Sequence, residues 1–182
     1  FFLYSVGVQS IILLATLYGK TEIGLPTSSL ILTIIVIPLV GVLGAYLFSR
    51  LSKKIGNISA LKITILIWTA ASLSAYYLDK DDPNVQLKFY VISGFIGLVL
   101  GAIQTLSRST YSKLLPENTL DPTTYFSFFD VTEKIAIVWG TFIFGLAIAI
   151  TDSMRLSILL LCLFFVISFI ILSMMKKTKY VK

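Results

Sequence analysis

The chain has 182 residues, of which 57% are hydrophobic and 13% are charged, and its formal net charge is +6. Soluble domains are about one quarter charged, so this composition, with a mean hydropathy of +0.92, indicates an integral membrane protein. The sequence contains no His and one Cys. This content argues against a catalytic His, a metal cluster or a disulfide framework, so we expect neither an enzyme nor a cofactor.

Six apolar segments are long enough to cross a membrane as helices, since about 20 residues span the ~30 Å hydrocarbon core. Continuous apolar runs of this length favour helices over the strands of a barrel. The sequence therefore predicts an all-α membrane protein. The expected spans are 1–19, 29–48, 61–78, 88–110, 126–150 and 155–175.

Most Lys and Arg residues fall on one side of this predicted bundle. They lie in the loop 49–60, after the fourth span and in the tail, whereas the connections on the other side mix fewer cations with acidic residues. The positive-inside rule therefore places both ends of the chain in the cytoplasm, and we expect a multi-pass protein of the inner (cell) membrane. Cations at the edges of apolar spans also explain the net charge without a nucleic-acid partner.

Between residues 94 and 116, glycines and polar residues recur at intervals of three and four. This spacing places them on one face of a helix whose other positions are mostly apolar. A helix surrounded by lipid has no use for such a stripe, which predicts close helix packing or a polar path. The members of the stripe are Gly94, Gly97, Gly101, Gln104 and Arg108.

Small residues at close spacing predict where other helices touch. Short loops favour contacts between consecutive antiparallel helices. Pro38 lies in the middle of the second span and should bend it, in either a moving or a rigid helix. The expected packing residues are Gly41 and Gly44 in the second span, Gly97 and Gly101 in the fourth, and Gly140 and Gly145 in the fifth.

Polar residues inside the spans are the candidates for function, because a charge near the bilayer centre costs about 2.5–3.5 kcal/mol. Gln9 and Gln104 either bond neighbouring helices or contact a substrate in a cavity. Arg108 either anchors the inner end of its helix or forms a gating ion pair with an acid of the fifth helix or of another part of the polypeptide.

Three charged residues, Asp130, Glu133 and Lys134, open the fifth span. Asp130 precedes Lys134 by four residues, so the two can pair along one helical face. One interpretation places this pair at the cytoplasmic rim, with Lys134 extending to the interface. The other is a charged relay or gate that lines a central cavity. The chain also opens with Phe1 inside an apolar run and without a basic leader, so we expect it to be the C-terminal portion of a longer polypeptide.

The run GLVLGAIQTLSRSTYSKLLP, residues 97–116, combines spaced glycines, a Gln, Leu-Ser-Arg-Ser, an aromatic residue and a Pro. In these features it resembles the vacuole-effluxer-like branch of the major facilitator superfamily, which is related to autophagy-linked amino-acid exporters. The run 124–134 continues the resemblance, although Thr124, Ser127 and Thr141 depart from the pattern of the family. Other fitting positions are Gly7, Val8, Gln9, Phe126, Lys134 and Gly140.

The resemblance implies that the six spans are helices seven to twelve of a twelve-helix transporter whose first half is missing here. In that fold two six-helix bundles enclose a central site and rock against each other. It further implies secondary active transport of small polar solutes, with amino acids as one candidate. The expected partners are lipid, the solute and the missing N-terminal half. The alternative is a non-transporting membrane scaffold or assembly subunit, which would use the same packing without a polar cavity.

Overall fold

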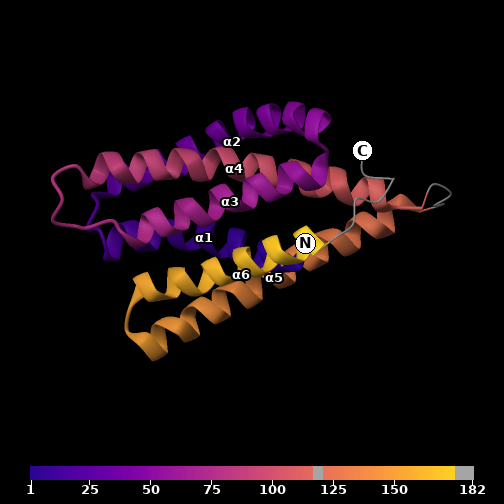
Figure 1. Ribbon diagram of the computed structural model, residues 1–182. Helices are drawn as coiled ribbons and strands as arrows, with labels where there is room; N and C mark the ends of the chain where they lie inside the picture. Colours follow the sequence, from indigo (N-terminus) through magenta and orange to yellow (C-terminus); the bar gives the residue numbers. More distant parts are fainter. Residues whose placement is uncertain (117–120, 175–182) are drawn as a thin grey trace.

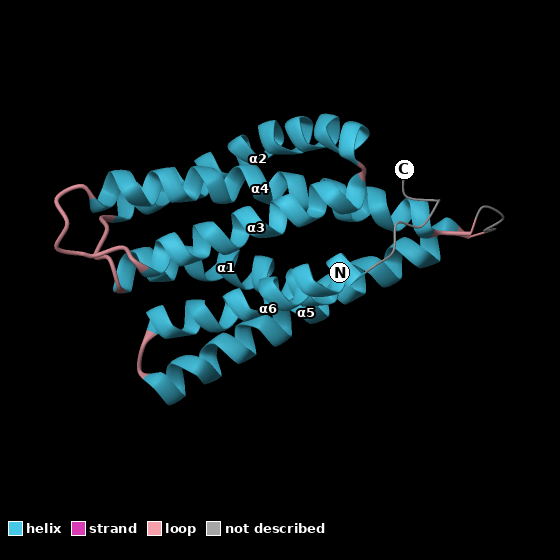
Figure 2. Cartoon of the chain, viewed as in Figure 1, coloured by secondary structure: helices cyan, strands magenta, loops and turns pink. Residues whose placement is uncertain are grey.

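The computed structural model describes residues 1–116 and 121–174, and these form helices joined by short connections, without a strand (Figure 2). This confirms the expected all-α membrane fold and is consistent with one six-helix half of a major facilitator. The helices are α1 (Phe2–Thr21), α2 (Thr27–Ile55), α3 (Asn57–Tyr76), α4 (Val85–Leu114), α5 (Pro122–Thr151) and α6 (Met154–Met174).

The helices α2 to α6 are each long and apolar enough to cross a membrane. α1 bends by 43° between Phe2–Ile12 and Leu14–Thr21, and it qualifies if these two parts form one span. Each helix overlaps one of the expected spans, and α2, α4 and α5 extend several residues beyond them. Hydropathy falls at the charged ends of these helices, whereas backbone hydrogen bonding continues through them.

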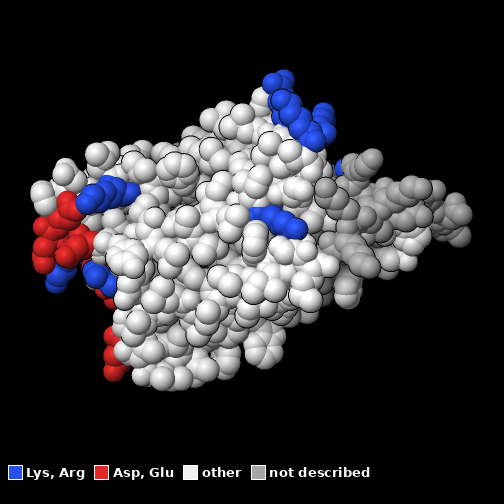
Figure 3. Space-filling model, viewed as in Figure 1, with Lys and Arg blue, Asp and Glu red and all other residues white. Residues whose placement is uncertain are grey.

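Successive helices run in opposite directions along the bundle (Figure 1). The α1–α2, α3–α4 and α5–α6 connections lie at one end, and the α2–α3 connection lies at the other (Figure 1). On the face seen in Figure 3, acidic residues gather at the first end, while only Lys and Arg are seen toward the second. We call these the acidic end and the basic end.

The most intimate helix contact joins α2 and α4, which are not consecutive and run in the same direction. A Cβ added at Gly44 would overlap the carbonyl of Leu98, and one at Gly101 would overlap the carbonyl of Gly41. A Cβ at Gly97 would lie 2.6 Å from the carbonyl oxygen of Ile37. The two backbones therefore touch, which is how helices gain packing energy in lipid. The expectation from short loops, that consecutive helices form the main contacts, is wrong for this pair.

The two glycines expected to pack on α5 differ from each other. A Cβ at Gly140 would overlap the Ser10 hydroxyl and lie 2.7 Å from the Val6 carbonyl oxygen, so Gly140 lets α1 approach α5. A Cβ at Gly145 would meet no atom of another described helix within 4 Å, so the expected contact is not formed there. Five residues turn an α-helix by about 140°, which points Gly145 away from the face of Gly140.

The N-terminal half of α1 packs on an aromatic contact between α3 and α6. The ring of Phe165 stacks on the buried Trp68 of α3 with centroids 5.7 Å apart. A Cβ at Gly7 would lie 2.8 Å from Cζ of this Phe165 ring, so α1 packs directly on it. This core sets the position of the α1 residues that follow Gly7.

α5 and α6 form a tight hairpin at the acidic end. Only Asp152 and Ser153 separate the two helices. Asp152 has φ of 50°, a left-handed conformation that ends α5, and its N–H bonds the carbonyl of Ile148. Asp is one of the few residues other than Gly that tolerates this conformation. The short connection thus allows the ends of the two long helices little movement relative to each other.

We expect Gly101→Ala to destabilise the protein because the new methyl group would force α2 and α4 apart. Overpacking of this kind typically costs about 1–3 kcal/mol. Gly94→Ala is the matched control on the same helix, since a Cβ there meets no atom within 4 Å. It should raise stability by about 0.5–1 kcal/mol through helix propensity. Thermal unfolding of the purified protein measures both, and equal effects would contradict the backbone contact.

Candidate functional site

A pocket of about 360 Å³ lies between α1, α4 and α5. Its wall combines aromatic rings with hydroxyl, amide and charged groups, which is unusual for helices that are otherwise apolar. Four of the candidate residues from the sequence meet in it: Gln9, Gln104, Arg108 and Glu133. The complete lining is Phe1, Tyr4, Ser5, Val8, Gln9, Ile103, Gln104, Thr105, Ser107, Arg108, Phe129 and Glu133.

Helical periodicity explains how three helices line one pocket. Residues four apart share a helical face, and each helix contributes such a pair to the wall. The pairs are Ser5 and Gln9 on α1, Gln104 and Arg108 on α4, and Phe129 and Glu133 on α5.

The start of α5 is capped, which sets the register of its wall residues. The Asp121 carboxylate accepts a hydrogen bond from the backbone N–H of Thr124, 3.2 Å away. A hydrogen bond from the Thr124 hydroxyl, assisted by that N–H, lowers the pKa of the exposed Asp121 carboxyl. An acceptor at this position satisfies one of the free N–H groups of the first turn.

Gln9 of α1 donates a hydrogen bond of 2.6 Å to Oε1 of Glu133 on α5. This bond crosses the pocket wall and is the only side-chain bond between α1 and α5 among the described residues. Glu133 is half-buried and forms no ion pair with any residue of 1–116 or 121–174. Its carboxylate is therefore held by a neutral amide, and it retains acceptor capacity toward the pocket.

Arg108 forms an ion pair with Asp130, with Nη2 of the guanidinium 2.5 Å from Oδ1 of the carboxylate. The guanidinium also lies 5.7 Å from the centroid of the Phe129 ring. Half of each charged side chain is exposed, 55% for Arg108 and 50% for Asp130. Exposed pairs of this kind contribute about 0–1 kcal/mol, so this ion pair itself costs little to break.

Lys134 lies elsewhere, on the outer face of α5. It is exposed and borders a shallow groove that is also lined by Asp130, Val131, Ile135, Val138 and Trp139. The expected pair of Asp130 and Lys134 is not formed, because Asp130 turns toward Arg108 on α4. Within the described ranges Lys134 has no ion-pair partner.

One contact in the wall was not anticipated from the sequence. The Tyr4 hydroxyl lies 2.8 Å from the Ser107 hydroxyl oxygen, and both side chains are buried. Ser107 donates its own proton to the carbonyl of Ile103, so Tyr4 is the donor to Ser107. The Leu-Ser-Arg-Ser run, in which Ser107 precedes Arg108, already marked Ser107 as a residue of interest. Nothing in the sequence indicates that Tyr4 is its partner.

Gln104 differs from Gln9 in having no hydrogen-bond partner among the described residues. Its side chain is exposed in the pocket wall, and it makes no hydrogen bond with the part of the chain that the structure describes. Of the two alternatives for these glutamines, the described chain shows the bond between helices for Gln9 and not for Gln104. Gln9 joins two helices, and Gln104 presents a free donor and a free acceptor to the pocket.

Comparisons with known proteins relate the whole chain to one group. A family model described as "Vacuole effluxer Atg22 like" matches residues 1–181. An uncharacterized MFS-type transporter of Bacillus subtilis, YxiO, is 26% identical over 95% of this chain and 39% of its own length. Autophagy-related protein 22 is 28% identical in Kluyveromyces lactis and 30% in Vanderwaltozyma polyspora, over 92% and 88% of this chain and 35% and 32% of those proteins. The chain thus spans less than two fifths of the length of these relatives.

A double-mutant cycle on Gln9→Ala and Glu133→Ala should show a coupling of about 1.5 kcal/mol, the low end for a hydrogen bond to a charged group. The low end is expected because Glu133 still reaches the pocket. Chemical or thermal unfolding of the single and double variants gives the coupling. Gln104→Ala combined with Glu133→Ala is the control and should be additive, and equal coupling in both cycles would contradict a specific bond.

Proposed function

Because the chain belongs to the vacuole effluxer Atg22-like family, we propose that it is the C-terminal six-helix half of a secondary active transporter. The transporter moves small polar solutes across the membrane by alternating access. The rest of the polypeptide supplies the other half of the central site. Amino acids are the first solutes to test.

The pocket between α1, α4 and α5 is the observation that carries this proposal. Polar and charged side chains within spans are expensive unless they face a partner or a water-filled cavity. Gln104 has no partner in the described chain, and Glu133 is held by one neutral amide. A path for polar solutes gives these groups water and ligands, whereas a scaffold has no need of them.

The chemistry of the wall suits solutes that both donate and accept hydrogen bonds. The Gln104 amide offers a donor and an acceptor, and the Glu133 carboxylate accepts only. The rings of Phe1, Tyr4 and Phe129 supply an apolar surface beside these groups. In this proposal Gln9 and Gln104 are the residues of the cavity, and Gln9 also sets the position of Glu133.

The ion pair of Arg108 and Asp130 is the proposed inner gate. It links α4 to α5 and costs little to break, as a gate that opens in every cycle requires. Lys134 has no acidic partner in the described chain, and an acidic residue from the rest of the polypeptide would form an ion pair with it. In this proposal both ends of the chain face the cytoplasm, and the cations at the basic end support that orientation.

Flux through the full-length parent protein in liposomes tests the function, with and without a proton gradient. Gln104→Ala should lower the flux of a transported solute by up to about tenfold, the effect of one lost hydrogen bond. Gln86→Ala is the matched control on α4, because Gln86 bonds Ser29 and Tyr90 outside the pocket. No flux for any amino acid, peptide or sugar would favour the scaffold.

Single Cys labels test the orientation in a Cys162→Ser background. Ser52 lies at the basic end of α2, and Asn84 precedes α4 at the acidic end. Cys at Ser52 should react with a membrane-impermeant reagent from the cytoplasmic side, and Cys at Asn84 from the opposite side. Reaction of both from one side would overturn the proposed topology.

A further inference from the structure

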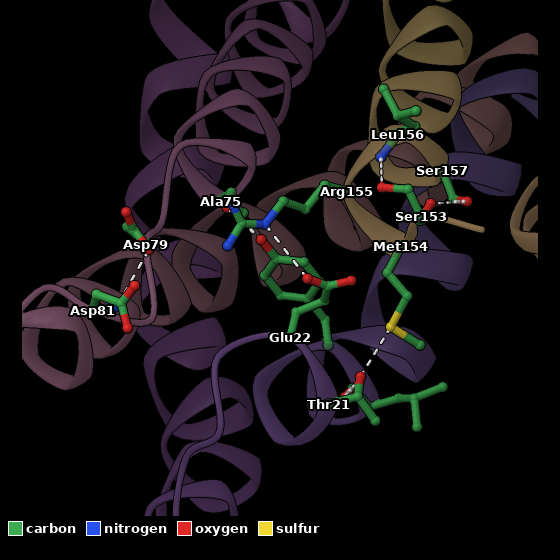
Figure 4. Close-up of polar contacts among 12 residues, drawn as sticks. Thr21, Glu22, Ala75, Asp79, Asp81, Ser153, Met154, Arg155, Leu156 and Ser157 are labelled. Carbon is green, nitrogen blue, oxygen red and sulfur yellow. Dashed lines mark hydrogen bonds and ion pairs between the residues drawn. The ribbon is translucent and has the colours of Figure 1, made fainter. Parts of the chain in front are cut away.

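A second group of polar contacts lies at the acidic end, away from the pocket. There the end of α1 meets the start of α6 and the end of α3 (Figure 4). The Thr21 hydroxyl of α1 donates to the carbonyl of Leu17 at 2.8 Å and also lies 3.0 Å from Sδ of Met154. The Tyr18 hydroxyl donates to the carbonyl of Ala75 at 2.7 Å. Glu22 and Arg155 form an ion pair beside them.

The ion pair is loose. Nε of Arg155 lies 3.5 Å from Oε2 of Glu22, and this Nε is buried and makes no hydrogen bond within the described chain. About a third of each side chain is exposed, 33% for Arg155 and 28% for Glu22. The pair therefore has neither the geometry nor the burial of a strong salt bridge.

Both charges also stand at unfavourable helix ends. Glu22 is the C-cap residue of α1, where the helix dipole is negative, and Arg155 is in the first turn of α6, where it is positive. Anions stabilise helix N-termini and cations stabilise C-termini, so each residue opposes the dipole of its own helix. Local helix stability thus favours the reverse arrangement, and only the contact between α1 and α6 favours this one.

We propose that Glu22 and Arg155 form a releasable latch between α1 and α6, kept weak by the dipoles of the two helices. When the latch is closed, it holds the outer part of α1 against α6 at the acidic end. When it opens, each charge loses its partner but gains water, and the α1 end separates from α6. The role of this opening in transport rests on the proposed function, whereas the weakness of the contact does not.

Exchanging the two charges tests the latch. The double variant Glu22→Arg/Arg155→Glu keeps an ion pair but places each charge at its favourable helix end, so the latch should become tighter than in the wild type. The melting temperature should rise by about 1–4 °C. Amide hydrogen exchange of the end of α1 should slow in the full-length parent in a bilayer, and the solute flux should fall severalfold.

Two further variants complete the experiment. Arg155→Gln removes the pair and should speed exchange at the end of α1. Asp82→Lys/Lys88→Asp is the matched charge exchange at the same end, because Lys88 and Asp82 pair locally between the α3–α4 connection and α4. It should leave both the exchange at α1 and the flux as in the wild type.

The outcomes separate the latch from the proposed function. Slower exchange and lower flux in the Glu22→Arg/Arg155→Glu variant support a latch that must open during transport. Higher stability with unchanged exchange and flux, or failure of that variant to fold, would overturn the proposal. If the parent moves no tested solute, the proposed function fails, and exchange at α1 alone then decides for or against the latch.

Discussion

Direct contact between the backbones of α2 and α4 is the constraint on which the arrangement of this bundle depends. In lipid there is no hydrophobic force between helices, so close van der Waals packing must hold them. The glycines of α2 and α4 allow that approach. Gln104 and Arg108 continue the helical face of Gly97 and Gly101 toward the end of α4, where they line the pocket with α1 and α5. One face of α4 thus packs on α2 at its glycines and lines the pocket at its polar residues.

The sequence predicts the helices well, because hydropathy is a local property. Of the stripe on α4, Gly97 and Gly101 pack on α2 and Gln104 and Arg108 line the pocket, whereas Gly94 does neither. The sequence predicts poorly which helices meet. Short connections favour contacts between consecutive helices. The closest pair is nevertheless α2 and α4, where the glycines of each helix lie against the backbone of the other. The pairing of Asp130 shows the same limit, since its neighbour Lys134 was the expected partner and the distant Arg108 is the observed one. Contacts such as Tyr4 with Ser107 join residues 103 positions apart, and no local pattern signals them.

The polar contacts of the molecule differ in strength according to where they lie. Tyr4 and Ser107 are buried and bonded, as the interior of a membrane protein requires. Toward the pocket, Glu133 keeps one neutral partner and Gln104 has none in the described chain. Toward the two ends of the bundle, the Arg108–Asp130 pair is about half exposed and the Glu22–Arg155 pair about a third exposed, and both are weak. Rigid packing in the middle is thus combined with contacts at the ends that break at little cost.

The two-residue connection between α5 and α6 ties the positions of these two long helices to each other. Asp152, with its left-handed backbone, leaves these helices almost no freedom to slide past each other. α5 carries Asp130 and Glu133 toward the basic end, and α6 carries Arg155 at the acidic end. A tilt of this hairpin therefore moves both sets of contacts at once. One short connection thus ties contacts at the acidic end of the bundle to contacts near its basic end.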